Sequence, residues 1–142
     1  MRLENKTALI TGASRNIGKE IALTFAREGA DVILNTRSSE QELEAVAAQC
    51  RELGVKAHTV LGDVSDSARV SAMVNEGIEA LGKIDILVSN VAIRPHRPIL
   101  EVTDEEWHQV LVITWAWLWC QDWWPWEPSG WSTTWSACPE GV

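Results

Sequence analysis

Short apolar runs alternate with amphipathic segments along the first 110 residues of this chain. The first run, residues 7–10, reads TALI and is bounded by a glycine turn, which is typical of a strand buried on both faces of a parallel sheet. The segment that follows has apolar residues at helical spacing, namely Ile17, Ile21, Leu23 and Phe25. A helix is therefore predicted there, ending at Gly29.

The same alternation repeats twice more and ends in another strand. It predicts strands at residues 31–36, 57–61 and 84–88, and helices at residues 39–53 and 67–81. Strands that alternate with helices of this length form right-handed βαβ units, which build a parallel sheet. The pattern therefore predicts an α/β fold.

A further helix is predicted to begin after Thr103, a candidate N-cap. Acidic residues at 104–106 suit the positive end of the helix dipole. We expect this helix to carry Trp107, Val110 and Leu111 inward.

The loop after the first predicted strand reads TGASRNIG, residues 11–18. Gly12 permits a tight turn, and Gly18 allows the helix to pack close to the strand. Free amides at the helix N-terminus would then face a pyrophosphate. The alternative interpretation is an ordinary strand-to-helix turn.

Two further motifs follow in order: Asp63-Val64 after the third predicted strand, and SNVA at residues 89–92 after the fourth. With the glycine loop, they resemble the short-chain dehydrogenase/reductase family, in particular its 3-oxoacyl-(acyl carrier protein) reductase members. The resemblance covers residues 1–111 and implies an NADP-binding half-domain. Its fold would be a Rossmann-type, doubly wound parallel sheet, truncated after the fourth strand and fourth helix, and residues 112–142 would form a separate Trp-rich tail.

The sequence departs from the family motifs at several positions. Asn16 replaces a glycine of the pattern TGxxxGxG, and asparagine tolerates left-handed backbone geometry better than most residues. Ser89 and Val91-Ala92 differ from the family's NNAG motif, whereas Asn90 matches it. The resemblance implies that Asn90 supports the cofactor site and ties neighbouring strands together.

The cofactor is predicted from charge. An acid at the end of the second strand would bind the ribose of NAD, whereas an arginine accommodates the 2′-phosphate of NADP. This chain has Asn35-Thr36-Arg37 there, and Arg15 adds a second cation. NADP is therefore favoured over NAD, unless Arg37 is only a solvated surface residue.

By resemblance, Asp63 would accept a hydrogen bond from the adenine amino group and Val64 would pack against the ring. Asp63 could instead cap the next helix. The predicted cofactor-binding residues are Gly12, Ser14, Arg15, Asn16, Ile17, Gly18, Arg37, Asp63, Val64, Asn90 and Ala92. A basic cluster at Arg94, His96 and Arg97 is either a ligand contact or a solvated loop.

The catalytic groups of the family have no counterpart in this sequence. The resemblance implies a tyrosine, a lysine four residues later, a serine and an asparagine on the fourth helix. The chain contains no tyrosine, and Lys83 and Asn90 are its last lysine and asparagine. We therefore assign no catalytic residue and predict an oxidoreductase by descent that is inactive alone.

Eight of the nine tryptophans lie within residues 115–135. Because tryptophan has the single codon TGG, a G-rich gene read in a shifted frame would produce such a stretch without hydrophobic periodicity. We favour a frameshifted or truncated reductase on the loss of that periodicity, with a genuine tail as the alternative.

Charge and composition limit the partners. All 12 Lys and Arg lie in residues 1–97, and the net charge is −8, so nucleic acid is not an expected partner. The apolar run at residues 110–119 is too short to span a membrane. Three cysteines without CxxC spacing indicate neither a metal site nor a disulfide framework. With no secretory signal pattern, a cytoplasmic location is expected.

Three functions therefore remain open at the level of sequence. The chain is a cofactor-binding half of an NADP-dependent oxidoreductase, a non-catalytic NADP(H)-binding or subunit-interaction module, or a surface-binding protein that acts through its Trp-rich tail. An uncovered sheet edge and this tail would also favour self-association.

Overall fold

A computed structural model describes residues 1–93 and 96–115. Strands β1 (Thr7–Ile10), β2 (Asp31–Thr36), β3 (Ala57–Leu61) and β4 (Ile86–Val88) form one sheet in the order β3-β2-β1-β4. All three pairings are parallel. The predicted α/β fold with a Rossmann-like sheet is confirmed, and the separate Trp-rich tail lies almost wholly outside the described residues.

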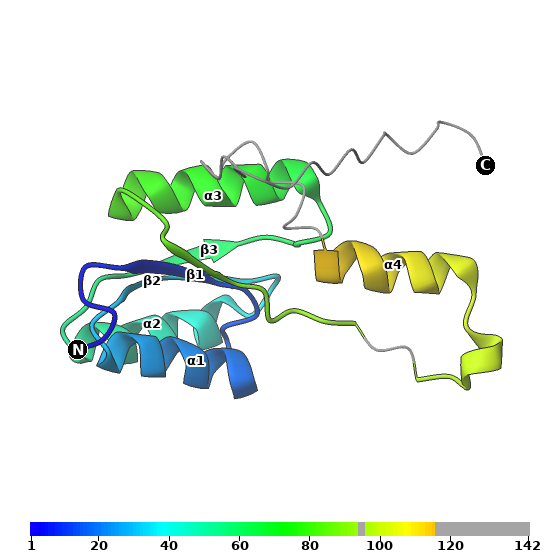
Figure 1. The fold of residues 1–142 in the computed structure, drawn as a ribbon, viewed down its shortest axis with the longest axis horizontal. Helices are drawn as coiled ribbons and strands as arrows, with labels where there is room; N and C mark the ends of the chain where they lie inside the picture. The colour runs from blue at the N-terminus through cyan, green and yellow to red at the C-terminus, as the bar shows by residue number, and fades with distance from the viewer. Residues whose placement is uncertain (94–95, 116–142) are drawn as a thin grey trace, which may run out of the picture.

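Helices cover both faces of this sheet (Figure 1). Helices α1 (Asn16–Arg27) and α2 (Glu40–Glu52) lie on one face, and α3 (Ser67–Leu81) lies on the other. A short 3₁₀ turn, η1 (Ile99–Glu101), precedes α4 (Asp104–Trp115), which lies beyond the end of the sheet. The glycine loop therefore leads from the central strand β1 into α1.

Side-chain alternation along the strands produces a core on each face. Ala8 and Ile10 of β1 pack on the α1 and α2 side, with Leu43 of α2. Leu9 faces the opposite way and packs with Met73 of α3. Because successive strand residues point to opposite faces, a strand covered on both sides is apolar throughout, as the sequence predicts for residues 7–10.

The last strand is shorter than predicted. Residues 84–88 were expected to be extended, whereas β4 begins at Ile86. The carboxylate of Asp85 accepts a hydrogen bond from the Thr7 amide at 2.9 Å and lies 2.9 Å from the Lys83 ammonium. The hydrogen bond from Lys83, followed by that from Thr7, lowers the pKa of Asp85. Residues 84–85 therefore form a polar connection between Lys83 and β4 in place of the first two residues of the predicted strand.

Helix α4 begins as predicted but buries a different face. The Thr103 hydroxyl accepts from the Glu106 amide and the Glu106 carboxylate accepts from the Thr103 amide, both at 3.2 Å, which forms a capping box. The expectation that Trp107 and Leu111 point inward is wrong, because they are 55% and 41% exposed. Ile113 is the buried residue, since α4 reaches the α3-side core only near its C-terminal end.

Candidate functional site

The loop between β1 and α1 makes a tight turn at Gly12. This residue has φ +63°, and a Cβ there would lie 3.1 Å from Cγ2 of Val91 and 3.2 Å from Nδ2 of Asn90. The next amide, of Ala13, donates to the Asn35 carbonyl at the end of β2. The loop is thus held between the carboxyl ends of β2 and β4.

Gly18 brings the first turn of α1 against this loop. A Cβ at Gly18 would lie 2.1 Å from the Gly12 carbonyl oxygen and 2.7 Å from Nδ2 of Asn90. Only a residue without a side chain fits at that distance. The predicted role of Gly18 in close helix packing is therefore consistent with its surroundings.

Asn16 has φ +50°, which is left-handed backbone geometry. A glycine or an asparagine accepts this conformation more readily than other residues do. The asparagine at this position therefore adopts the left-handed backbone that the turn was expected to need, although the family pattern has a glycine there.

The N-terminus of α1 offers several unpaired donors. Within the described part of the chain, the backbone amides of Asn16, Ile17 and Gly18 donate to no protein acceptor. The first turn holds no acidic residue, while the exposed Arg15 precedes it and Lys19 follows. Free amides and the positive helix dipole together form an environment that favours an anion.

Asn90 connects the end of β4 to the glycine loop. Its Nδ2 donates to the carbonyl oxygens of Thr11 and Gly12, both at 3.2 Å, and its amide donates to the Thr11 hydroxyl at 3.0 Å. The Thr11 hydroxyl also reaches the Val88 carbonyl at 3.4 Å. The implied tie between neighbouring strands is present in these contacts, and Ala92 lies exposed just beyond them.

Two further residues, to which the sequence analysis assigned no role, hold the strand ends of the site together. Thr11 joins Asn90 as described above, and the buried Asn35 donates from Nδ2 to the Val60 and Gly62 carbonyls at 3.3 and 3.1 Å. These bonds hold the end of β2 to β3. Next to it, the Thr36 hydroxyl lies 3.5 Å from the buried Ser14 hydroxyl, which links β2 to the glycine loop.

Arg37 and Asp63 meet at the carboxyl ends of β2 and β3. The Arg37 guanidinium, largely exposed, lies 3.7 Å from the Asp63 carboxylate. The other Asp63 oxygen accepts from the Ser65 amide and hydroxyl at 2.9 and 2.7 Å. These bonds, and then Arg37, lower the pKa of Asp63. Asp63 is therefore ionised at neutral pH and opposes any anion that approaches Arg37.

The alternative role predicted for Asp63, capping of the next helix, is filled by Asp66. Asp66 caps α3, because its side chain accepts from the amides of Ala68 and Arg69. The side chain of Val64 is buried in the core on the α3 side. A ligand at this position would therefore meet the backbone of Val64 more readily than its side chain.

The predicted basic cluster is only partly described. Arg94 lies outside the described residues, His96 is exposed, and Arg97 pairs with Glu106 at 3.3 Å. Among the residues the structure covers, no group of three metal-ligating side chains comes together. Each helix in the described ranges is too short or too polar to span a lipid bilayer.

The predicted site residues thus gather along one edge of the sheet, at the carboxyl ends of β1, β2, β3 and β4. A family profile described as short chain dehydrogenase matches residues 6–116. The chain belongs to the short-chain dehydrogenase family. The resemblance drawn from the glycine loop, the Asp63-Val64 pair and Asn90 is confirmed.

Curated and solved relatives agree with this assignment. The 3-oxoacyl-(acyl-carrier-protein) reductase FabG of Staphylococcus aureus is 37% identical over 106 residues, which is 75% of this chain and 43% of that protein. A Burkholderia cenocepacia short chain dehydrogenase in complex with NADP matches with TM-score 0.74 and 35% identity, over 80% of this chain and 46% of that one.

Carveol dehydrogenase from Mycobacterium avium, in complex with NAD, matches with TM-score 0.73 and 27% identity, over 81% of this chain and 47% of that one. This chain therefore spans less than half the length of these relatives. One of these solved relatives is in complex with NAD and the other with NADP. Membership of the family therefore indicates a nicotinamide dinucleotide and does not distinguish NAD from NADP.

Proposed function

We propose that residues 1–111 form the dinucleotide-binding unit of a short-chain oxidoreductase and prefer NADP(H) to NAD(H). The observation that carries this proposal is the set of free amides at Asn16, Ile17 and Gly18, at the N-terminus of a helix that Gly18 brings against β1. These groups suit a pyrophosphate in geometry and in charge.

The preference for NADP(H) rests on the carboxyl end of β2. Arg37 lies there with most of its side chain exposed, and the preceding residues Asn35 and Thr36 bring no carboxylate that would bind a ribose 2′-hydroxyl. A guanidinium binds phosphate through charge-assisted hydrogen bonds. Among the described residues, Asp63 is the one charged group that pairs with Arg37, and a 2′-phosphate would compete with its carboxylate for the guanidinium.

Each part of the proposed site has its own task. The α1 amides would bind the pyrophosphate, and Arg37 would bind the 2′-phosphate. Asp63 and the backbone of Val64 would contact the adenine. Asn90 would keep the ends of β1 and β4 aligned beneath the cofactor. The cofactor itself, when bound, supplies or accepts a hydride.

Substitution of Arg37 by alanine is expected to weaken NADPH binding about tenfold, as loss of an exposed charge-assisted contact implies. NADH affinity should stay the same, because NADH has no 2′-phosphate. Isothermal titration of the full chain with each dinucleotide measures both values. Arg27→Ala removes an exposed arginine from the opposite end of α1 and should change neither affinity.

If Arg37→Ala weakened NADPH and NADH equally, Arg37 would not contact the 2′-phosphate. If the unaltered chain bound neither dinucleotide at millimolar concentration, the proposed binding function itself would fail.

We further propose that this chain does not reduce carbonyl compounds by itself. General acid catalysis needs a proton donor within hydrogen-bond reach of the reacting oxygen. In the family, a tyrosine assisted by a lysine four residues later supplies this proton. This chain contains no tyrosine, and no lysine follows Lys83.

The expected result is no NADPH oxidation above the protein-free rate with a β-ketoacyl thioester, followed by absorbance at 340 nm. The Staphylococcus aureus reductase, assayed in parallel, is the positive control for the substrate. Turnover above the protein-free rate would overturn this proposal, because the unit would then carry its own catalytic group. Loss of that turnover in the Asn90→Ser variant would show that the activity comes from this chain and not from a contaminant.

A non-catalytic binding or subunit-interaction module is the second candidate, and the same free amides favour it. Dinucleotide binding without turnover is what this candidate predicts too. A third candidate, a surface-binding role for the Trp-rich tail, rests on residues 116–142, which lie outside the described part of the chain.

A further inference from the structure

The carboxyl end of β3 leads directly into Asp63, and a buried side chain of β2 holds it on one side. The last backbone bond between the two strands runs from the Gly62 amide to the Thr36 carbonyl at 3.0 Å. The Gly62 carbonyl lies beyond this ladder, and Nδ2 of Asn35 donates to it at 3.1 Å and to the Val60 carbonyl at 3.3 Å. Asn35 is 1% exposed, so these bonds form away from water.

Arg69 of α3 holds the same segment from the other side. The amide and the carbonyl of one trans peptide point in opposite directions, so the Leu61 carbonyl faces away from β2. Nε and Nη2 of Arg69 both donate to this carbonyl, Nε at 2.8 Å. Nη2 also lies 3.6 Å from the Glu76 carboxylate. The three successive carbonyls before Asp63 are therefore each bound by a side chain.

Arg69 can lie this close to the strand because residue 62 is a glycine. A Cβ at Gly62 would lie 2.7 Å from Cγ and 2.8 Å from Nε of Arg69. It would also lie 2.5 Å from Sδ of Met73, which is fully buried. A side chain at this position would displace Arg69 from the Leu61 carbonyl.

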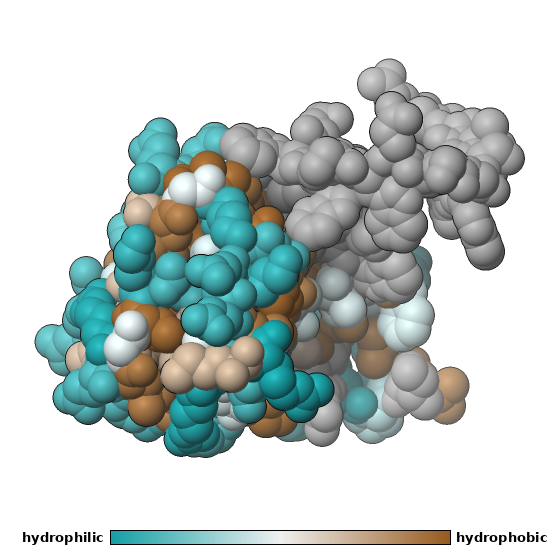
Figure 2. Space-filling view, turned by 60° about the vertical axis from the view of Figure 1, so that its left-hand side comes forward, coloured by the Kyte–Doolittle hydropathy of each residue, from teal (hydrophilic) through white to brown (hydrophobic). Residues whose placement is uncertain are grey.

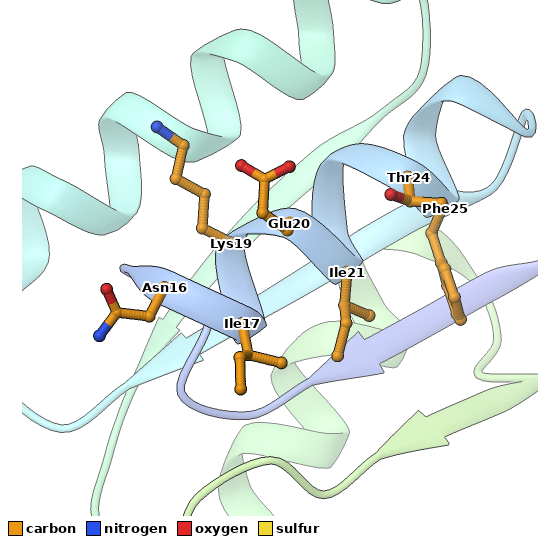
Figure 3. A pocket seen from close by; sticks show the side chains of 7 residues that line it. All are labelled: Asn16, Ile17, Lys19, Glu20, Ile21, Thr24 and Phe25. Atoms are coloured by element: carbon orange, nitrogen blue, oxygen red, sulfur yellow. The ribbon is translucent and has the colours of Figure 1, made fainter.

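The held segment ends at the side of the site opposite the glycine loop. Figure 3 shows Asn16 at the start of α1, where the proposed pyrophosphate site lies, and β2 separates the end of β1 from the end of β3. One oxygen of the Asp63 carboxylate accepts from Ser65, and the other lies 3.7 Å from Arg37. The place of this carboxylate therefore depends on the backbone that carries it.

We propose that Arg69 and Asn35 are positioning residues for the adenine end of the dinucleotide, which fix the backbone before Asp63 so that its carboxylate meets the adenine amino group. This role rests on the proposed function, in which Asp63 contacts the adenine. Hydrogen bonds weaken steeply when donor and acceptor are misaligned, so a contact on a held backbone is stronger than one on a mobile backbone. Both residues act through Asp63 and not on the cofactor itself.

An analogue without the adenine amino group isolates this contact. Reduced nicotinamide hypoxanthine dinucleotide phosphate has a carbonyl oxygen where NADPH has the amino group, and this oxygen cannot donate to Asp63. The unaltered full chain should bind NADPH about tenfold more tightly than the analogue, as a hydrogen bond to a charged group implies. Isothermal titration with each dinucleotide gives this ratio of affinities.

Arg69→Met removes the guanidinium and keeps an unbranched side chain. The affinity ratio should fall to about twofold, because Asp63 is no longer held in line with the amino group. Binding of the analogue should change little, and Arg69→Lys, which keeps one cationic donor, should restore part of the ratio. The described surface in Figure 2 is largely polar with separate apolar patches, so one more surface methionine does not create a large apolar area.

Arg51→Met is the matched control. Arg51 of α2 makes the same kind of contact at the other end of β3, where Nε and Nη2 donate to the Ala57 carbonyl at 3.1 and 2.8 Å. It also pairs with an acid, Glu44. This variant removes an equivalent contact from the same strand and should leave the affinity ratio unchanged.

Asn35→Leu tests the contact from β2. Leucine has no donor, so the Gly62 carbonyl loses its side-chain partner, and the affinity ratio should fall as in Arg69→Met. Asn35 is buried, so circular dichroism must show that this variant folds. If it does not fold, Arg69→Met decides the question, because the Arg69 side chain is 37% exposed.

An unchanged ratio in Arg69→Met would overturn the proposal. An equal loss of affinity for both dinucleotides would do the same, because it would indicate a structural contact only. A ratio lowered as far by Arg51→Met would also overturn it, by assigning the effect to β3 as a whole. If the unaltered chain bound both dinucleotides equally, no adenine contact would exist to be positioned, while dinucleotide binding would stand. If it bound neither, the proposed function itself would fail.

Discussion

Replacement of Gly18 by alanine is expected to abolish dinucleotide binding and to lower the free energy of unfolding by about 3 kcal/mol, the upper range for overpacking. The new Cβ would lie 2.1 Å from the Gly12 carbonyl oxygen and 2.9 Å from its carbonyl carbon. Both are backbone atoms of a tight turn, so neither can rotate away. The helix must move, and its free amides then lose their position beside β1.

Urea denaturation and titration with NADPH measure the two effects. Gly77→Ala provides the matched control, since Gly77 is also a buried helical glycine. Its Cβ would lie 2.7 Å from Cδ1 and 3.2 Å from Cγ2 of the buried Ile33, which are side-chain and not backbone atoms. This control should lower stability by about 1–2 kcal/mol, as moderate overpacking does, and leave NADPH affinity unchanged, because Gly77 lies in α3 and its crowded neighbour is not part of the glycine loop. Normal binding by Gly18→Ala would mean that the close contact is not needed.

Replacement of Asn90 by aspartate is the second large change. It exchanges a donor for an acceptor beside the Thr11 and Gly12 carbonyl oxygens, each 3.2 Å from Nδ2. Two hydrogen bonds become repulsive contacts in a half-buried position. A loss of about 2–4 kcal/mol of unfolding free energy is expected, together with weaker NADPH binding.

The pH dependence of this variant identifies the cause. Two facing carbonyls disfavour the charged form, so the pKa of the introduced carboxyl is raised in the folded state. The protonated carboxyl can donate, and the stability it contributes is therefore present at low pH and lost as pH rises through the folded-state pKa. Relative to the unaltered chain, the variant should lose stability between about pH 4, the ordinary Asp value, and neutral pH.

Urea denaturation at pH 4.5 and pH 7.5 gives the comparison. Asn75→Asp makes the same change at an exposed position of α3 and should show neither the loss nor the pH dependence. A pH-independent loss in Asn90→Asp would point to altered packing of β4 instead of acceptor–acceptor repulsion.

Local patterns along the chain were sufficient to predict the elements and the family. Helical and strand periods are local properties of the chain, so the sheet, its parallel sense and three of its four strands follow from residues 7–61. The turn at Gly12 and the left-handed backbone at Asn16 are also local, because they depend on each residue's own φ preference. Motif order then identified the short-chain dehydrogenase family.

Which groups these elements bring together depends on the packing of the whole fold. Periodicity indicates that a helix has an apolar side and does not say what covers it, which is why Trp107 was expected inside and lies exposed. The start of β4 depends on Asp85 meeting Thr7, 78 residues earlier, and the role of Thr11 depends on Asn90, 79 residues later. The place of β4 beside β1 likewise follows from strand order, a property of the whole sheet that no local pattern contains.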